Sequence, residues 1–264
     1  MVSNAFRMSS LHTKRTGTAV RNYFHTLFTT WGPQHWWPAE SPFEVIVGAF
    51  LTQNTSWKNV ERAMANLRDQ GLLSIDGIRR LELCEVEQLI RPAGYFRQKA
   101  ARLKNFVSHL DRLYGGSLER MFARPTGELR TELLLLNGVG PETADSILLY
   151  AGHHEVFVVD AYTRRIFERH GLADSKAKYD DIRRMVETAL AGADSRRAKL
   201  APPATAFAAP PAVHTPSTMS EAPRSQLAQD YSEFHGLIVQ VAKQHCLKAA
   251  PRCEGCPLSP FLPK

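Results

Sequence analysis

Residues 136–170, LNGVGPETADSILLYAGHHEVFVVDAYTRRIFERH, combine a tight glycine turn with an isolated carboxylate, and they decide how the rest of the chain is interpreted. Pro141 stands where a helix is predicted to begin, a position at which the N–H that proline lacks would have no partner anyway. Glu142 follows in the first turn, where the helix dipole favours a negative charge. An apolar run over 156–159 then ends at Asp160. The glycine turn can bind a phosphate, and the acid can take part in chemistry beside it.

The rest of the sequence predicts an all-α fold. Apolar residues recur at helical spacing in most segments, and the strand-like run at 156–159 is too short to seed a sheet. We expect residues 1–17 to be flexible and a helical domain over 18–191 and 224–264. Residues 192–223 are rich in Ala, Pro and Ser and bury too little to offset their ordering entropy, so we predict a disordered insertion there.

The length, composition and net charge of the chain narrow the class of protein. With 264 residues, 44% of them hydrophobic, the chain can build one large domain or two small ones. The net charge of +7 favours an anionic partner, although many soluble proteins are mildly basic. Nothing resembles a signal peptide or a membrane span, so we expect a cytoplasmic, reducing environment and no membrane partner. Met1 and Met8 are alternative starts of translation.

The glycine turn has a specific motif around it. Two helices joined by LNGVG form a helix-hairpin-helix, whose backbone amides can bind a phosphate without reading sequence. The pattern is LxGVGxxTAxxIL followed by VVDAYTRRIF. This segment resembles the helix-hairpin-helix, Gly/Pro-rich loop and Asp motif of the endonuclease III superfamily of DNA glycosylases, and the resemblance extends over about 31–256. It implies that Gly138, Val139, Gly140 and Thr143 contact DNA.

The resemblance implies a fold, a substrate and a catalytic residue. We expect two helical lobes with the active site between them and both chain ends in one lobe. The expected partner is duplex DNA with damaged bases, bound by a nucleoid-associated monomer. The aspartate that is essential for base excision in the family matches Asp160. The alternative is that Asp160 is only a buried cap or an ion-pair partner of Arg164 or Arg165.

One departure from the family pattern predicts the reaction type. Bifunctional members carry a lysine nucleophile two residues after the second glycine, and this chain has Glu142 there. A carboxylate cannot form an imine, so we predict a monofunctional glycosylase that leaves an abasic site. Asp160 would stabilise the developing oxocarbenium sugar or orient the attacking water, after the target base is flipped out of the duplex.

Aromatic residues suggest which base is removed. Trp36, Trp37, Pro38 and Trp57 resemble the pocket of the 3-methyladenine DNA glycosylase III branch. Electron-rich rings attract a cationic alkylated purine, by about 1–2 kcal/mol when desolvated. The alternative is that these tryptophans are ordinary core residues. The same branch has counterparts of Glu142, of Phe234-His235-Gly236 and of Lys243. Without the resemblance, Lys243 would be a solvated surface lysine.

Several polar residues are candidates for DNA contact. Gln53 and Asn54 follow an apolar run, and Gln53 lies where the superfamily places the residue that fills the gap left by the flipped base. A helix-terminal polar cap is the alternative for Gln53. Arg97 and Lys99 begin a basic helix and are interpreted either as contacts to the DNA backbone or as a solvated face.

Three cysteines near the C-terminus predict metal ligation rather than disulfides. Cys246-x6-Cys253-x2-Cys256 matches the first three ligands of the superfamily's 4Fe-4S cluster, but Leu262 occupies the fourth position. A cluster normally needs four thiolates. Either a cluster binds with an incomplete or substituted ligand set, or the loop folds without metal. Cys84 is remote, and we expect it to be buried.

Two other functions remain open from the sequence. The same fold can excise oxidised pyrimidines or mismatched bases instead of alkylated purines. From a different class, the chain can be a non-catalytic protein that binds DNA structure through the hairpin alone.

Overall fold

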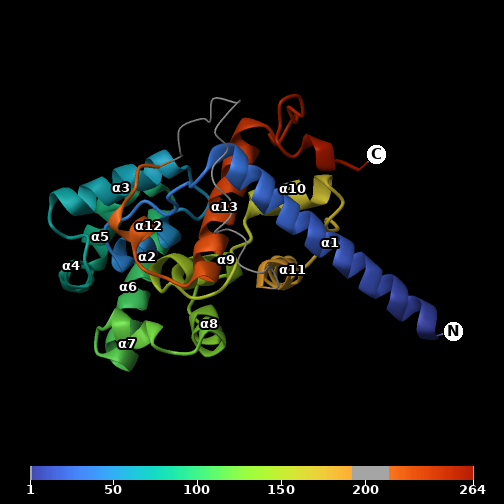
Figure 1. Cartoon of the computed structure of the whole chain (residues 1–264). Helices are drawn as coiled ribbons and strands as arrows, with labels where there is room; N and C mark the ends of the chain where they lie inside the picture. Colours follow the sequence, from blue (N-terminus) through green and yellow to red (C-terminus); the bar gives the residue numbers. More distant parts are fainter. Residues whose placement is uncertain (1, 192–213, 264) are drawn as a thin grey trace. The chain divides into compact units, whose positions relative to one another are not determined.

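The structure is a computed structural model that describes residues 2–191 and 214–263, with side chains from Arg15 onward. The described chain consists of helices and connecting loops without a strand, which confirms the predicted all-α fold (Figure 1). It divides into two compact units. The first unit comprises Met1–Trp36, Val156–Pro216 and Pro223–Lys264, and the second comprises Trp37–Glu155 and Ser217–Ala222.

The first unit is built around one buried helix, α13 (Gln226–Gln244). Ser225 caps its N-terminus through a hydrogen bond from the Ala228 N–H to the Ser225 hydroxyl. Every residue of α13 from Tyr231 to Ala242 is buried, which is typical of a central helix. The helices that pack against α13 are α1 (Val2–Trp31), α10 (Ala161–Arg169) and α11 (Tyr179–Ala191).

The second unit is centred on α2 (Pro42–Leu51), in which every residue after the first is buried. Ser41 caps this helix, and Gly48 leaves room for the Trp37 ring, 3.0 Å from where a Cβ would stand. The surrounding elements are α3 (Trp57–Asp69), α4 (Ile75–Arg80), α5 (Leu83–Leu89), η1 (Arg91–Ala93), α6 (Phe96–Tyr114), α7 (Leu118–Phe122), α8 (Thr126–Leu134), α9 (Pro141–Ser146), the π-helical turn η2 (Ile147–Ala151) and α12 (Thr218–Glu221).

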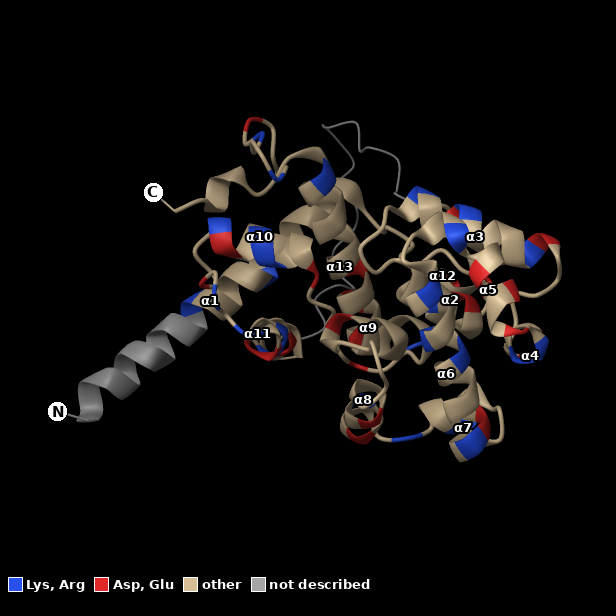
Figure 2. Ribbon diagram, turned by 180° about the vertical axis from the view of Figure 1, so that it is seen from behind, with Lys and Arg blue, Asp and Glu red and all other residues tan. Residues whose placement is uncertain are grey.

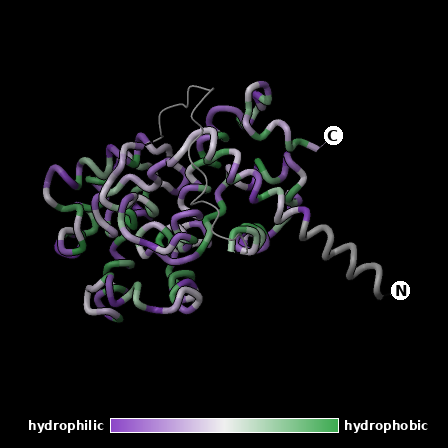
Figure 3. Tube along the Cα trace, viewed as in Figure 1, coloured by the Kyte–Doolittle hydropathy of each residue, from purple (hydrophilic) through white to green (hydrophobic). Residues whose placement is uncertain are grey.

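Hydrophilic and hydrophobic residues are mixed along most of the helices that surround these two, as in helices with one buried face (Figure 3). Lys and Arg residues are visible on α3, α6 and α10 (Figure 2). No described helix combines the length and the apolar character needed to cross a bilayer.

The structure corrects several expected boundaries. Helix α1 begins at Val2 rather than at Thr18. Residues 192–213 lie outside the described residues, but 214–223 are described and include α12, so the predicted disorder was wrong for that part. Met219 in α12 is 4% exposed, and its N–H donates to the Ala39 carbonyl at 3.0 Å. Tertiary burial therefore orders a sequence whose composition favours disorder.

Candidate active site

The glycine turn joins α8 to α9 in the second unit, as the sequence predicted. Gly138 has a φ of 80°, and Arg102 occupies the space that a Cβ at this position would need. Gly140 is the N-cap of α9 and gives no side-chain cap to the first N–H groups of the helix. Val139 and Thr143 are both buried. The start of α9 therefore has the arrangement of backbone N–H groups that binds anions.

Gln53 is hydrogen-bonded to this hairpin. Its Nε2 donates to the Gly138 carbonyl at 3.0 Å and to the Thr143 hydroxyl at 2.9 Å. Its Oε1 accepts from Arg102 Nη1 at 2.5 Å. The side chain therefore ties the end of α2 to the hairpin rather than capping its own helix. Asn54 is exposed and has a φ of 53°, a left-handed conformation that asparagine tolerates.

Of the two basic residues at the start of α6, Lys99 has neither of the roles expected from the sequence. Lys99 is 1% exposed, and its Nζ donates to the carbonyls of Leu51 and Ala93 at 3.0 and 2.7 Å. Burial and the nearby Arg102 lower the pKa of Lys99 to about 8. Lys99 is therefore neither placed to contact a DNA backbone nor part of a solvated face. Arg97 has an 82% exposed side chain and remains a candidate for DNA contact.

Two of the expected pocket tryptophans pack together in the second unit. The Trp37 and Trp57 rings are 5.2 Å apart and nearly perpendicular, and Tyr150 on the π-helical turn lies 5.3 Å from Trp37. We call Trp37, Trp57 and Tyr150 the tryptophan cluster. Trp37 is buried, as the core interpretation expects, whereas Trp57 and Pro38 are half-buried. Trp57 therefore has the ring surface in this cluster that a base could contact.

Trp36 lies in the first unit, although it is adjacent to Trp37 in sequence. Its ring is 5.1 Å from His214 and 5.8 Å from His235. Burial lowers the pKa of His214 to about 4, and the positive charge of Lys243 adds to this effect. Lys243 itself is exposed on α13. The structure thus brings Trp36 and Lys243 into the neighbourhood of one histidine that the sequence did not single out.

Asp160 is the N-cap of α10 in the first unit. Its Oδ1 accepts from the Thr163 N–H at 2.7 Å and from the Thr163 hydroxyl at 2.8 Å. Its Oδ2 lies 3.5 Å from His235 Nε2. Arg164 and Arg165 donate elsewhere, to the carbonyls of Ala177 and Cys246. The cap proposed as an alternative is therefore present, whereas the expected arginine partner is replaced by a histidine.

The surroundings of Asp160 keep the carboxylate ionised. The residue is 9% exposed, and burial on its own raises the pKa of this carboxyl. The charge of His235 and the donors of Thr163 outweigh burial, and the pKa of Asp160 lies below its usual value. A buried, ionised carboxylate is the group that can stabilise a positive charge developing next to it.

Glu142 is exposed in the first turn of α9, in the second unit. Its backbone carbonyl accepts from the Ser146 hydroxyl at 2.7 Å. The position therefore belongs to the hairpin, as the sequence predicted, and it carries a carboxylate rather than an amine.

The three C-terminal cysteines line a single cavity of about 260 Å³ in the first unit. Leu262, at the expected position of the fourth ligand, lines the same cavity. Cys246 is buried, and its Sγ accepts from Arg169 Nη1 at 3.2 Å, whereas Cys253 is exposed. Across the described residues, no group of three metal-binding side chains is placed closely enough to hold an ion. The donor set does not fit a four-thiolate cluster, because a leucine stands at the fourth position. Cys84 is exposed, so its expected burial was wrong.

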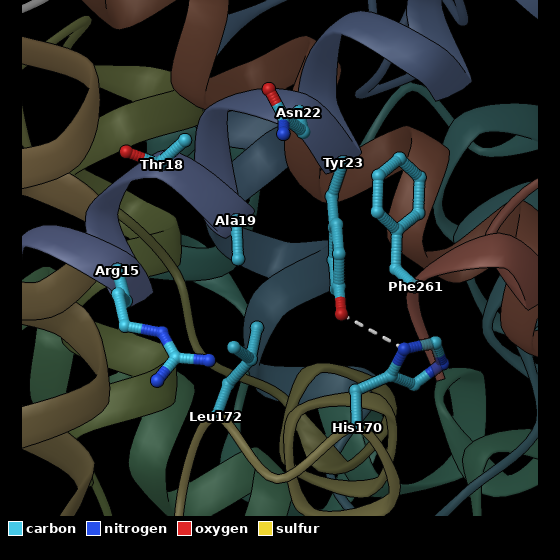
Figure 4. A pocket seen from close by; sticks show the side chains of 8 residues that line it. All are labelled: Arg15, Thr18, Ala19, Asn22, Tyr23, His170, Leu172 and Phe261. Carbon is cyan, nitrogen blue, oxygen red and sulfur yellow. Dashed lines mark hydrogen bonds between the residues drawn. The ribbon is translucent and has the colours of Figure 1, made fainter. Parts of the chain in front are cut away.

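Protein contacts hold the end of this cysteine loop. The Tyr23 hydroxyl lies 2.8 Å from His170 Nδ1, and the Tyr23 ring lies 5.2 Å from Phe261 (Figure 4). These three residues line a second cavity of about 430 Å³, and His170 also lines the cysteine cavity. Arg169 donates to the carbonyls of residues 247 and 248 at 2.7 and 2.9 Å. The segment next to Leu262 is therefore anchored by contacts within the protein.

The sequence alone missed three residues next to the expected site. His235 was noted only as part of a motif, although it contacts Asp160. His214 lies in the segment predicted to be disordered, and no sequence motif singles out Tyr150.

Comparison with known proteins supports the family. The sequence matches the HhH-GPD superfamily of base excision DNA repair proteins over residues 47–191. A provisionally named DNA repair glycosylase of Methanocaldococcus jannaschii is 42% identical over 243 residues, 92% of this chain and 94% of that protein. Endonuclease III of Bacillus subtilis is 24% identical over 218 residues, covering 83% of this chain and 79% of that protein.

Two solved structures share the fold of this chain. The H. pylori 3-methyladenine DNA glycosylase bound to 1,N6-ethenoadenine aligns with a TM-score of 0.64 at 27% identity, over 90% of this chain and 99% of that one. An endonuclease III–DNA covalent intermediate shares the fold, with a TM-score of 0.67 at 19% identity, over 93% and 95% of the two chains. The chain belongs to the HhH-GPD superfamily of base excision repair proteins and is a DNA glycosylase.

Proposed function

We propose that this protein is a monofunctional DNA glycosylase that removes alkylated purines, such as 3-methyladenine, from duplex DNA. The observation that carries the proposal is Asp160, a buried carboxylate kept ionised at the start of α10. The similarity to the H. pylori 3-methyladenine glycosylase supports the base class. The described aromatic residues, Trp36 in one unit and the tryptophan cluster in the other, agree with this base class.

The proposed reaction breaks the bond between C1′ and the base nitrogen. An alkylated purine is cationic, so its electron pair leaves with the base and gives a neutral product. The sugar becomes positively charged as the bond breaks, and the Asp160 carboxylate stabilises this charge. Water then bonds to C1′ and loses one proton, which leaves an abasic site. The target base is first flipped out of the stack.

Stacking adds to the preference for a cationic base. An aromatic ring attracts a cation by about 2 kcal/mol when the pair is desolvated. Trp57 is half-buried, and we propose that its ring is the one that contacts the base. The cationic base is also a good leaving group, and for this reason one carboxylate and stacking are sufficient for its release.

The absence of lyase activity is part of the proposal. A lyase step needs an amine that attacks C1′ and forms an imine. Glu142 carries a carboxylate at the position where bifunctional members of the family have lysine. Without an amine at this position, the proposed reaction transfers the sugar to water, and strand cleavage is not expected.

On the DNA side, we propose that the hairpin binds one phosphate through the start of α9. Gln53 is held at this hairpin by three hydrogen bonds, and its amide is the proposed replacement for the flipped base. We expect the protein to act as a monomer and near the nucleoid. A metal cluster has no role in the proposed reaction.

A second substrate class is supported by one observation, the similarity to endonuclease III of Bacillus subtilis. In this alternative the enzyme would act on oxidised pyrimidines or mismatched bases. A hairpin protein without catalysis is the non-enzymatic alternative.

One experiment separates these functions. Purified protein is incubated with duplexes that carry 3-methyladenine, an oxidised pyrimidine or a mismatch, and the released bases are identified by mass. Release of 3-methyladenine with an intact, alkali-labile strand supports the proposal. Release of a pyrimidine only would replace the substrate class, and no release from any duplex, with DNA binding retained, would support the binding protein.

A further inference from the structure

The residues next to His235 on α13 pack against residues 34–36, in the same unit. Gly236 has no side chain, and a Cβ there would lie 3.0 Å from Gln34 Cβ and 3.1 Å from Trp36 Cβ. Glu233 Oε2 accepts from the Gln34 N–H at 2.6 Å, and the Ser232 hydroxyl donates to the Trp36 carbonyl at 2.7 Å. One turn of α13, which includes His235, is thus held against residues 34–36 by two hydrogen bonds and one close contact.

His235 is enclosed between aromatic rings and the acid. It is 5% exposed, and its ring is 5.8 Å from Trp36 and 6.5 Å from Phe157, at steep angles to both. Its Nε2 points to Asp160, 3.5 Å from Oδ2. The imidazole therefore has little freedom to turn away from the carboxylate.

The two oxygens of Asp160 have separate partners. Thr163 provides both short donors to Oδ1. Oδ2 is directed to His235, so the histidine decides the orientation of the oxygen that is not committed to the helix cap. We propose that His235 is a positioning residue, which holds the Asp160 carboxylate through Nε2 in the orientation needed for base excision. This inference rests on the proposed catalytic role of Asp160.

Other charged groups around α13 are engaged elsewhere. Glu233 bonds Gln34 and Gln229, and His214 and Lys243 lie on the Trp36 side. From α10, Arg164 and Arg165 bond backbone carbonyls, and from α11, Arg183 pairs with Glu187, which also accepts from the Phe157 N–H. The Asp160 carboxylate is the charged group that lies against His235 Nε2, at 3.5 Å.

The test compares two substitutions at His235. His235→Gln retains an N–H donor at a similar reach, and His235→Leu removes the donor. The measurement is the single-turnover rate of base release, on whichever duplex the parent releases a base from, together with the Kd for DNA. His109→Gln is the matched control, because His109 is another buried histidine paired with a carboxylate, 2.7 Å from Glu132 in the second unit.

We expect His235→Leu to lower the rate by about tenfold to hundredfold with little change in Kd, the loss typical of one hydrogen bond to a charged group. His235→Gln should recover most of the rate, while His109→Gln keeps the parent rate. An unchanged rate in His235→Leu, or a loss in His235→Gln as large as that in His235→Leu, overturns the proposal. If His235→Leu does not fold, His235→Asn, whose shorter side chain cannot place its N–H at the same position, takes its place in the comparison.

Failure of this inference and failure of the proposed function give different results. An active parent, an inactive Asp160→Asn and unaffected His235 variants reject only the positioning role. A parent that releases no base from any duplex rejects the proposed function itself.

Discussion

Asp160 combines a structural and a proposed chemical role, and two substitutions separate them. In Asp160→Asn the side-chain oxygen that accepts from the Thr163 N–H is retained, whereas the charge is lost. In Asp160→Ala both are lost. Because asparagine and aspartate are about equally good N-caps, the asparagine variant tests the charge with the helix start preserved.

The expected magnitudes differ enough to be measured. Loss of an N-cap costs about 1 kcal/mol, within a range of roughly 0.5–2 kcal/mol, so Asp160→Ala should be clearly less stable and Asp160→Asn only slightly so. Removal of a preorganised electrostatic group lowers the rate of the chemical step by about 10²–10³-fold. We therefore expect both variants to lose this much activity, although only one of them loses the cap.

The pH dependence of stability gives a second check. The pKa of Asp160 is lowered in the folded protein, so its charge contributes stability above the unfolded pKa, and this contribution disappears as the pH falls through the folded pKa. The difference in unfolding free energy between the parent and Asp160→Asn should accordingly be largest near neutral pH and shrink in acid.

The assay is single-turnover release of 3-methyladenine from methylated duplex DNA, run beside urea unfolding of the same preparations. Ser74→Ala is the control, because Ser74 caps α4 through the Gly77 N–H at 3.0 Å and lies in the second unit. It should lose stability like Asp160→Ala and keep its activity. A folded Asp160→Asn whose rate stays within tenfold of the parent would show that Asp160 is only a cap.

Three further predictions follow from the other site residues. Trp57→Ala should reduce excision of 3-methyladenine much more than it reduces stability, because the ring is half-buried, and Trp57→Phe should restore part of the rate; equal losses in rate and stability would place Trp57 in the core. Borohydride should trap no covalent complex of the parent with DNA, because Glu142 offers no amine; a trapped complex, seen as a shifted band on a denaturing gel, contradicts this. Protein purified without oxygen should contain less than one four-iron cluster per chain and keep a folded, protease-resistant C-terminus, because Leu262 replaces a ligand and Tyr23, His170 and Arg169 anchor the loop; stoichiometric iron with four-iron absorbance would refute it.

Local sequence patterns were sufficient for much of the fold. The hairpin between α8 and α9 follows from the glycines, because Gly138 needs a positive φ that other residues rarely adopt. Helix α11 lies within the predicted helical domain, and its buried residues Ile182, Val186 and Leu190 recur at helical spacing in the sequence. The course of 214–223 was not predictable in this way. Its order depends on Met219 and Ser217, which bond residues 37–39 from a distant part of the chain.

The candidate site was predictable only where one residue carries the signal. Asp160 stands out because a single acid follows an apolar run, but its partner His235 is brought to it by the packing of α13 on α10. Lys99 shows the opposite failure. Its position at the start of a basic helix indicated exposure, whereas the carbonyls of Leu51 and Ala93 that surround its Nζ come from elements that no local pattern connects to it.

The cap and the catalytic interpretation of Asp160 were alternatives in the sequence, but the structure makes them interdependent. A carboxylate buried to this degree tends to take up a proton, and a neutral acid cannot stabilise a cationic sugar. The two donors of Thr163 that form the cap also favour the ionised form. The contact that starts α10 is therefore part of what keeps the acid charged. Because the cap occupies Oδ1 alone, Oδ2 is left to His235 and to the reaction.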